Sequence, residues 1–280
     1  MNEIYNNRYN EFKNYCLDNI PWIDRIPIPH IKQEQIKETV FIELRCLPHI
    51  YFILRNAIRV LGNEWSHTVI CGEANYNFIL DIKRKLGRDI RIIKLEKENL
   101  TRLEYSIMLL KSSFWSQFYG KYILIHQEDS IIFKKIPNFY FKYDYVGAPF
   151  FNKKIGNGGF SLRNKETMIN ICKKHYDLFE DRIGKSRHFL EQKIEYLVSK
   201  NIDYKNDRKF IFLYNIEKNL LEDVLLCNKI QHFPSFVEAQ EFSVEKYFFK
   251  NPVGGHQFWY AVKDINKWLN LNLKNVIRNK

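Results

Sequence analysis

The chain has 280 residues, of which 45% are hydrophobic and 16% aromatic, and its formal net charge is +12. This length can bury a large core as one big domain or two small ones, and the composition excludes an intrinsically disordered protein. The charge favours an acidic partner, such as nucleic acid, an anionic membrane surface or a nucleotide diphosphate. Because no dense Lys/Arg block or nucleic-acid motif is present, nucleic acid is the least expected of these. Charge spread over the surface for solubility is the alternative.

The cysteines and the apolar segments indicate a cytoplasmic protein. The five cysteines are scattered and form no Cys-x-x-Cys pair, which favours reduced thiols over a disulfide framework or a zinc site. No apolar run approaches the roughly 20 residues that span a bilayer, and the N-terminus lacks the apolar core of a signal peptide. We therefore expect neither a signal peptide nor a membrane span.

Residues 1–37 predict an arm that packs on the main domain, because a helical apolar period is followed by a proline-containing extended piece. Strands then alternate with helices. The expected strands cover residues 39–44, 67–71 and 90–95, with a fourth from residue 122, and the expected helices cover residues 48–61, 76–86, 100–114 and 164–175. This order predicts an α/β fold with a mostly parallel sheet between helices. The main domain is expected at 38–265, with a charged helical insertion at 176–219 and a basic tail at 266–280.

The fourth strand ends in Gln127-Glu128-Asp129. Polar residues just past a buried strand are where α/β proteins bind ligands. If the chain stays extended, Gln127 and Asp129 share one face, and Glu128 and Ser130 share the other. The stretch is then a candidate for the Asp-x-Asp device of nucleotide-sugar glycosyltransferases, with Gln at the first position. Such a device holds Mn²⁺ or Mg²⁺, which neutralises a diphosphate leaving group. A solvated turn is the alternative.

Arg45 and Glu73 follow the first two strands, so a parallel sheet places them at the same edge as Asp129. Arg45 can pair bidentately with a phosphate or a carboxylate. Glu73 can accept from ribose hydroxyls or from a base amide. A surface arginine and a turn glutamate are the alternatives for each residue alone, but together the three favour a nucleotide diphosphate with a metal.

The segment 156–159, Gly-Asn-Gly-Gly, is a candidate binding loop. Three glycines in four residues let a ligand approach the backbone closely. Their spacing excludes a Rossmann fingerprint and a P-loop. Asn157 and Ser161 add hydrogen-bonding groups beside the glycines; a plain tight turn is the alternative.

Four further residues near the C-terminus carry chemistry of the kind that sugar transfer needs. Glu222 and Asp223 open an apolar helix, where the helix dipole favours acids for structural reasons, yet such a carboxylate can also take the proton of an attacking sugar hydroxyl. His256 lies in a glycine-containing loop and can bind a metal or a phosphate. Trp259 offers a flat face on which sugars stack. A packed histidine and a core tryptophan are the alternatives.

The order of these motifs resembles a family of glycosyltransferase-like proteins that is classed as a domain of unknown function and has members in large DNA viruses. The resemblance covers about residues 38–259. It rests on residues 41–45, 65, 71–73, 99–101, 104–105, 114–115, 127–130, 143–149, 156–163, 222–224, 242–245 and 255–256. The family looks like the GT-A glycosyltransferase fold, a Rossmann-like sheet. Its glycine loop and Glu-Asp-Val motif are similar to those of inverting β-galactosyltransferase-type enzymes.

The resemblance implies roles residue by residue. Asp129 corresponds to a metal ligand, Gln127 to the neutral counterpart of the first Asp, and His256 to a second metal or diphosphate contact. Asp223 corresponds to the base, with Glu222 as its support. The implied donor contacts add Arg45, Glu73 and Tyr105, and the implied acceptor contacts are Asn157, Gly158, Gly159 and Trp259. Because Gln127 removes one negative charge, we expect modest metal affinity without the donor or a weaker dependence on metal.

These observations predict a metal-assisted, inverting glycosyltransferase that moves a sugar from a UDP-linked donor to a hydroxyl of a glycan or protein, in the host cytoplasm or the virion if the chain is viral. The alternatives are a sugar nucleotidyltransferase, a catalytically inactive glycan- or nucleotide-binding module on the same fold, and a nucleic-acid binder driven by charge. The donor sugar, the acceptor, the linkage, retention of configuration and the oligomeric state stay open.

Overall fold

The computed structural model describes residues 2–177 and 221–274, and the chain forms two compact units. The first contains Met1–Asn99, Phe118–Lys165 and Ile230–Lys280, and the second contains Leu100–Gln117 and Glu166–Lys229. The predicted insertion at 176–219 lies almost wholly outside the described residues. Within the described ranges, none of the helices has the length and apolarity to cross a membrane.

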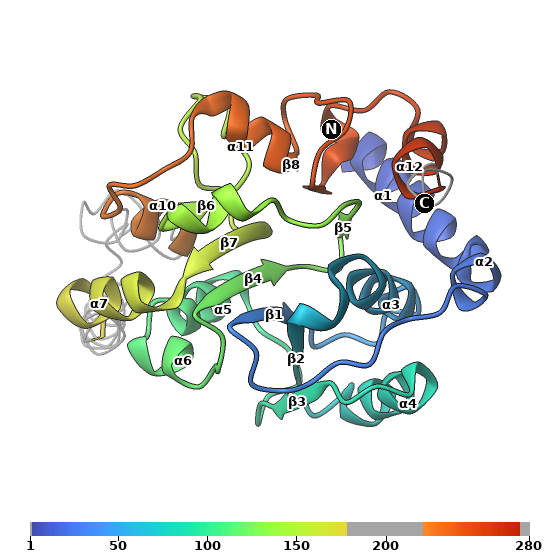
Figure 1. The fold of residues 1–280 in the computed structure, drawn as a ribbon, viewed down its shortest axis with the longest axis horizontal. Coiled ribbons are helices and arrows are strands. Elements are labelled where there is room, and N and C mark those ends of the chain that lie inside the picture. Colours follow the sequence, from blue (N-terminus) through green and yellow to red (C-terminus); the bar gives the residue numbers. More distant parts are fainter. Residues whose placement is uncertain (1, 178–220, 275–280) are drawn as a thin grey trace, which may run out of the picture. The chain divides into compact units, whose positions relative to one another are not determined.

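A six-stranded sheet forms the centre of the first unit, in the order β3-β2-β1-β4-β7-β6 (Figure 1). Its strands, in chain order, are β1 (Lys37–Ile42), β2 (Trp65–Cys71), β3 (Arg91–Lys94), β4 (Tyr122–His126), β6 (Tyr145–Val146) and β7 (Phe160–Asn164). The first four are parallel, whereas β7 is antiparallel to both β4 and β6. The predicted α/β fold with a mostly parallel sheet is therefore confirmed.

Burial explains why the central strands read as continuous apolar runs. Every residue of β2 is buried, as is every residue of β1 after Lys37, because helices cover the sheet. The helices of this unit are α1 (Asn2–Asp18), α2 (Ile20–Asp24), α3 (Ile50–Leu61), α4 (Tyr76–Leu86), α11 (Phe236–Phe242) and α12 (Ile265–Lys274), with short 3₁₀ turns at Gly62–Glu64, Asn138–Lys142 and Phe258–Tyr260. α4 has the predicted bounds, and the left-handed Gly87 (φ 59°) ends it.

The strand order places a topological switch point beside β1. The chain adds β2 and β3 on one side of β1 and then returns to add β4 on the other side. In open α/β sheets, ligands bind outside the carboxyl ends of the strands at such a reversal. The edge between the ends of β1 and β4 is therefore the expected ligand crevice.

Residues 127–130 form a turn, so the expectation that the chain stays extended there is wrong. Ser130 donates from its backbone N (3.1 Å) and from its Oγ (2.6 Å) to the Gln127 carbonyl, which closes the turn. β5 (Ser130–Ile132) then joins a second sheet with β9 (Gly254–His256) and β8 (Ser243–Val244). In this sheet Ser130 pairs with His256, which brings the C-terminal glycine-histidine segment to the end of β4.

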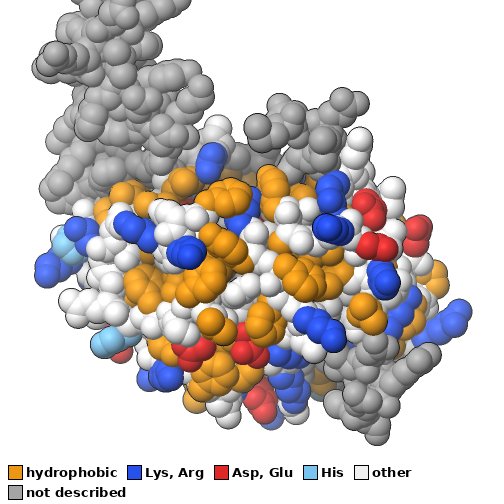
Figure 2. Space-filling view, turned by 90° about the horizontal axis from the view of Figure 1, so that it is seen from above, with side chains coloured by type: hydrophobic (Ala, Val, Ile, Leu, Met, Phe, Trp, Pro, Cys, Tyr) orange, Lys and Arg blue, Asp and Glu red, His pale blue; other side chains and the backbone are white. Residues whose placement is uncertain are grey.

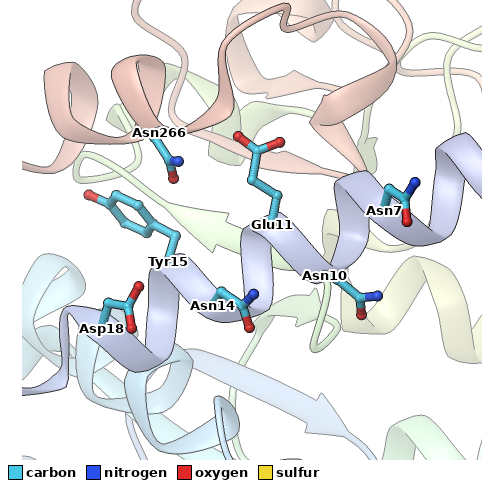
Figure 3. A pocket seen from close by; sticks show the side chains of 7 residues that line it. All are labelled: Asn7, Asn10, Glu11, Asn14, Tyr15, Asp18 and Asn266. Atoms are coloured by element: carbon cyan, nitrogen blue, oxygen red, sulfur yellow. The ribbon is translucent and has the colours of Figure 1, made fainter.

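The helices at both ends of the described chain, α1 and α12, are part of the first unit and pack into its core. Phe12 and Cys16 of α1 are fully buried in the main core. Near the other end, Leu269 and Leu273 give α12 a buried face that lies beside α1 (Figure 1). Between the two helices is a polar groove of ≈ 350 Å³ (Figure 3), lined by Asn7, Asn10, Glu11, Asn14, Tyr15, Asp18 and Asn266.

The described part of the second unit is helical. Its helices are α5 (Arg102–Leu109), α6 (Ser112–Ser116), α7 (Lys165–His175) and α10 (Glu222–Cys227). The helix predicted at 100–114 is split in two. Asp177 accepts from the backbone N and the Oγ of Ser112 (2.7 Å each), and Trp115 donates to the Leu109 carbonyl (2.8 Å), so side chains satisfy the backbone at the break.

Lys and Arg side chains lie scattered among apolar and neutral side chains on the face shown in Figure 2. This distribution fits a positive charge that is spread over the surface. On this face, the described residues form no continuous basic track of the kind that follows a nucleic-acid backbone.

Two buried histidines of the central sheet predict loss of stability in acid. Burial lowers the pKa of His126 to about 3, and burial together with the charge of His126 lowers the pKa of His67 to about 3. The free energy of unfolding should be highest above pH 6.5 and fall as the pH drops toward 3, because only the unfolded chain takes up these protons. At pH 5 each histidine should cost about 2 kcal/mol.

Urea unfolding at pH 7.5 and pH 5 measures this loss. His126→Phe should recover about half of it, since the ring of His126 already packs on Phe41 and its two nitrogens have no hydrogen-bond partner among the described residues. An unchanged pH dependence in His126→Phe would show that His126 does not titrate on unfolding.

Candidate functional site

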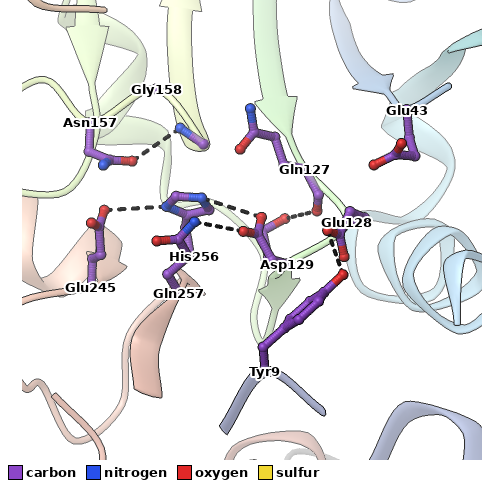
Figure 4. A network of polar contacts seen from close by, with 12 residues as sticks. Tyr9, Glu43, Gln127, Glu128, Asp129, Asn157, Gly158, Glu245, His256 and Gln257 are labelled. Carbon is purple, nitrogen blue, oxygen red and sulfur yellow. Dashed lines mark hydrogen bonds and ion pairs between the residues drawn. The ribbon is translucent and has the colours of Figure 1, made fainter. Parts of the chain in front are cut away.

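The turn after β4 and the end of β9 bring Asp129 and His256 into contact. Asp129 Oδ1 lies 3.3 Å from His256 Nε2, and Gln257 Nε2 donates to Asp129 Oδ2 over 2.8 Å (Figure 4). The backbone N of Gln257 also donates to the Asp129 carbonyl over 3.1 Å. Asp129 is 8% and His256 5% exposed, so both lie below the surface at the switch point.

The Asp129–His256 contact is an ion pair with unused hydrogen-bonding capacity. The N–H of the His256 ring does not point at Asp129 Oδ1, so the contact is not a hydrogen bond. Asp129 Oδ1 and His256 Nε2 therefore have no hydrogen-bond partner among the described residues. Burial alone would lower the pKa of His256, but Asp129 and Glu245 outweigh it and raise the pKa to about 10. Burial would likewise raise the pKa of Asp129, but His256 and Gln257 keep it lowered. Both groups are therefore charged at neutral pH.

The glycine loop packs directly on the imidazole ring. Gly159 accepts from the backbone N of Gln127 (3.1 Å) and donates to Asn157 Oδ1 (3.1 Å), so the Asn157 side chain holds the loop itself. The Gly158 carbonyl accepts from Ser161 Oγ over 3.0 Å. A Cβ on Gly159 would lie 2.3 Å from His256 Nε2. Only glycine therefore leaves room for the ring at this place.

Gly159→Ala should displace the His256 ring. We expect a loss of roughly 1–3 kcal/mol in stability from overpacking, and weaker binding of any ligand held by Asp129 and His256. Gly87→Ala is the matched control, because its left-handed backbone costs about 1–2 kcal/mol at a place where a Cβ meets nothing within 4 Å. Thermal unfolding and calorimetric titration with UDP and Mn²⁺ measure both effects. Equal ligand affinity in the two variants would contradict a role of the Gly159 contact in the site.

Glu128 enters a second cluster beside the first. Its Oε1 accepts from Tyr9 (2.7 Å) and from Arg45 Nη2 (3.0 Å), and its Oε2 lies 2.9 Å from His49 Nε2. Burial raises the pKa of Tyr9, and Glu128 raises it further. The N-terminal arm therefore reaches the switch point through Tyr9 (Figure 4), a contact that the sequence did not predict.

Arg45 lies at the predicted edge, but two carboxylates hold it. Its Nε and Nη2 donate to Glu43 over 2.8 and 2.7 Å, and its Nη2 also reaches Glu128. The hydrogen bonds to Glu43 raise the pKa of Arg45. About half of the side chain, 51%, stays exposed, so the guanidinium is oriented at the edge rather than covered.

The other predicted site residues are dispersed. Glu73 is exposed at the end of β2, with its Oε1 3.8 Å from Lys94 Nζ. Trp259 is 2% exposed and packs on Tyr9 and Phe12, with ring centroids 5.7 Å apart in each case. The prediction that a sugar stacks on Trp259 is therefore wrong in this arrangement, because core aromatics cover the ring.

Three predicted residues belong to the second unit. Tyr105 lies on α5, and the acids Glu222 and Asp223 occupy the first turn of α10, as the sequence predicted. Asp223 Oδ1 accepts from the backbone N of Val224 over 2.8 Å. This bond leaves the carboxylate at the start of the helix, where the dipole favours its charged form.

Sequence reasoning assigned no role to Glu245, although the structure places it against His256. Glu245 directly follows β8, is 5% exposed, and has Oε2 3.3 Å from His256 Nδ1. The signal that could have found it is an acid just past a short buried strand, which is the pattern that singled out Asp129.

One carboxylate and one imidazole lie close enough together to be two ligands of one divalent cation, once His256 has lost its Nε2 proton. Ligands at neighbouring corners of a six-coordinate ion, each roughly 2.1 Å from it, lie about 3 Å apart, close to the 3.3 Å between Asp129 Oδ1 and His256 Nε2. In the described ranges, no three His, Cys, Asp or Glu side chains are placed to hold a metal together. A cation held by this pair would therefore need further ligands from outside the described side chains.

Comparisons with known proteins find one family and several distant likenesses. The sequence model of the family described as "Protein of unknown function (DUF5672)" matches residues 89–256, more than half of the chain. Cysteine–tRNA ligases of Borreliella burgdorferi and Borreliella afzelii are 25% and 24% identical over 227 residues, covering 73% of this chain and 44% of each ligase. The chain thus spans less than half the length of these curated relatives.

Two solved structures show a distant likeness to the chain. The apo form of the glycosyltransferase GlyE of Streptococcus pneumoniae is 12% identical with a TM-score of 0.46, covering 88% of this chain and 62% of GlyE. The 4-diphosphocytidyl-2C-methyl-D-erythritol synthase of Anaerococcus prevotii is 12% identical with a TM-score of 0.36, covering 51% of this chain and 75% of the synthase.

Proposed function

The chain belongs to the DUF5672 family, and we propose that it is a metal-assisted glycosyltransferase that moves a sugar from a UDP-linked donor to a hydroxyl of a glycan or protein. One observation supports this above all: a buried carboxylate oxygen and a buried imidazole nitrogen, both without a hydrogen-bond partner in the described part of the chain, face each other at the switch point of the sheet. Such a pair could hold a divalent cation beside a diphosphate.

Asp129 and His256 would hold the cation, which would supply positive charge beside the departing UDP. His256 must give up its Nε2 proton for this, so the protein alone is expected to keep the ion pair and to bind metal chiefly together with the donor. Arg45, oriented by Glu43 and Glu128, offers its exposed guanidinium to a phosphate oxygen.

Asp223 takes the proton of the acceptor hydroxyl as that oxygen attacks the anomeric carbon, with Glu222 in support. A single displacement of this kind inverts the configuration of the sugar. The glycine loop at 156–159 lines the acceptor.

Incubation with a panel of nucleoside-diphosphate sugars and Mn²⁺ tests the function. We expect release of UDP from one donor, loss of this release with EDTA, and an inverted anomeric centre in the product by NMR. Release of pyrophosphate from a sugar phosphate and UTP would instead indicate a nucleotidyltransferase. No turnover across the panel, together with retained UDP binding, would indicate an inactive binding module and overturn the proposal.

A further inference from the structure

The two carboxylates around His256 lie on opposite sides of its ring. Asp129 Oδ1 lies 3.3 Å from Nε2, and Glu245 Oε2 lies 3.3 Å from Nδ1, as Figure 4 shows. An ion bound at Nε2 is therefore out of reach of Glu245, which explains why these three side chains form no three-ligand metal site.

The backbone fixes His256 so that its ring has little freedom. Gly255 is paired with Val244 of β8, and His256 with Ser130 of β5, so β9 is held on both sides. Gly159 closes on the Nε2 edge of the ring. The orientation of the ring then depends on Asp129 at Nε2 and Glu245 at Nδ1.

Glu245 is itself held in place. Lys246 Nζ lies 3.3 Å from Glu245 Oε1, and the same ammonium lies over the Tyr260 ring, 3.1 Å from its centroid. Glu245 therefore contacts Lys246 through Oε1 and His256 through Oε2. This is the arrangement in which a carboxylate accepts the N–H of a metal-binding histidine and so orients it.

We propose that Glu245 is a positioning residue that accepts the Nδ1–H of His256, holds the proton on that nitrogen, and thereby presents the Nε2 lone pair to the cation beside Asp129. The inference deepens the proposed function and rests on it for the identity of the ligand. Glu245 itself touches neither the cation nor the donor.

Calorimetric titration with UDP and Mn²⁺ tests the role of Glu245. We expect Glu245→Gln to weaken binding by about 10- to 100-fold, the usual effect of losing such an outer carboxylate. Glu245→Asp should lose a similar amount, because it keeps the charge but is too short to reach Nδ1. The matched control is Glu241→Gln, which removes a carboxylate 3.3 Å from a lysine, Lys134, and should leave affinity unchanged. Wild-type affinity in both Glu245 variants would overturn the proposal.

A second measurement needs neither metal nor donor. In ¹⁵N-histidine-labelled protein, NMR should show a slowly exchanging Nδ1 proton on His256. This signal should disappear in Glu245→Met, whose side chain has a similar length but cannot accept the N–H, and should persist in Glu241→Gln. A persistent signal in Glu245→Met would overturn the positioning role. If the wild type shows this proton but binds no UDP with Mn²⁺, the proposed function fails while the contact of Glu245 with His256 stands.

Discussion

Asp129→Ala should abolish sugar transfer and sharply weaken binding of UDP with Mn²⁺. Asp129 Oδ1 is the buried carboxylate oxygen that faces His256 Nε2, and its removal would take away both the proposed metal ligand and the negative charge that would attract the cation. We expect transfer to fall by at least about 10³-fold, because stabilising the charge that develops on the leaving group usually contributes most to catalysis of this kind. Initial rates of UDP release and calorimetric titration measure the two effects.

The alanine variant also removes one of the two carboxylates that face the charged His256, which should cost about 3–5 kcal/mol in stability. Asp129→Asn is therefore the more informative change, because its side-chain oxygen can still accept from Gln257 while the charge is lost. Asp144→Asn is the matched control, since Asp144 Oδ2 lies 3.2 Å from another histidine, His232. The control should keep activity. Turnover in Asp129→Asn at the rate of the control would show that the cation assignment is wrong.

The central sheet and its ligand edge were predictable because burial leaves a direct mark on the sequence. Strands buried on both faces must be apolar throughout, so β1, β2 and β4 stood out as runs between helices. Polar residues after such runs mark the carboxyl edge, which is how Arg45 and Asp129 were found. Glu43, the partner of Arg45, lies only two residues before it, but the contact of Tyr9 with Glu128 was not predictable, because it joins distant parts of the chain and leaves no local pattern.

The turn at 127–130 was missed for a related reason. Ser130 closes it with two hydrogen bonds to one carbonyl, and a local alternation of polar and apolar residues gives no sign of this. The turn nevertheless keeps Asp129 and Glu128 apart: one contacts His256 and the other Arg45. Alternation thus predicted that the two acids separate, although the backbone that separates them is not extended.

The pair Trp259 and Tyr260 shows where residue type misleads. A tryptophan near a site suggests a stacking surface. Trp259, however, has the larger apolar ring and is buried in the core, whereas Tyr260 is 50% exposed and lies beside Lys246. Which of two adjacent aromatics is buried depends on the direction of the 3₁₀ turn Phe258–Tyr260. Left-handed Gln257 (φ 45°) sets that direction, and composition does not reveal it.

Asp223→Asn should slow transfer by about 10²- to 10⁴-fold and leave the affinity for UDP with Mn²⁺ unchanged, because a base acts on the acceptor hydroxyl and not on the donor. The amide oxygen of Asn can still accept from the backbone N of Val224, so the first turn of α10 should persist. Glu222→Gln is the matched control: it removes the neighbouring acid of the same turn and should have the smaller effect.

The two aspartates are then distinguished by what each variant retains. Asp129→Asn should no longer bind the donor. Asp223→Asn should still bind the donor and should still release UDP slowly, by hydrolysis of the donor. A full rate in Asp223→Asn, or a loss of donor affinity equal to that of Asp129→Asn, would place Asp223 outside the role of base and leave the start of α10 with a purely structural reason for its acids.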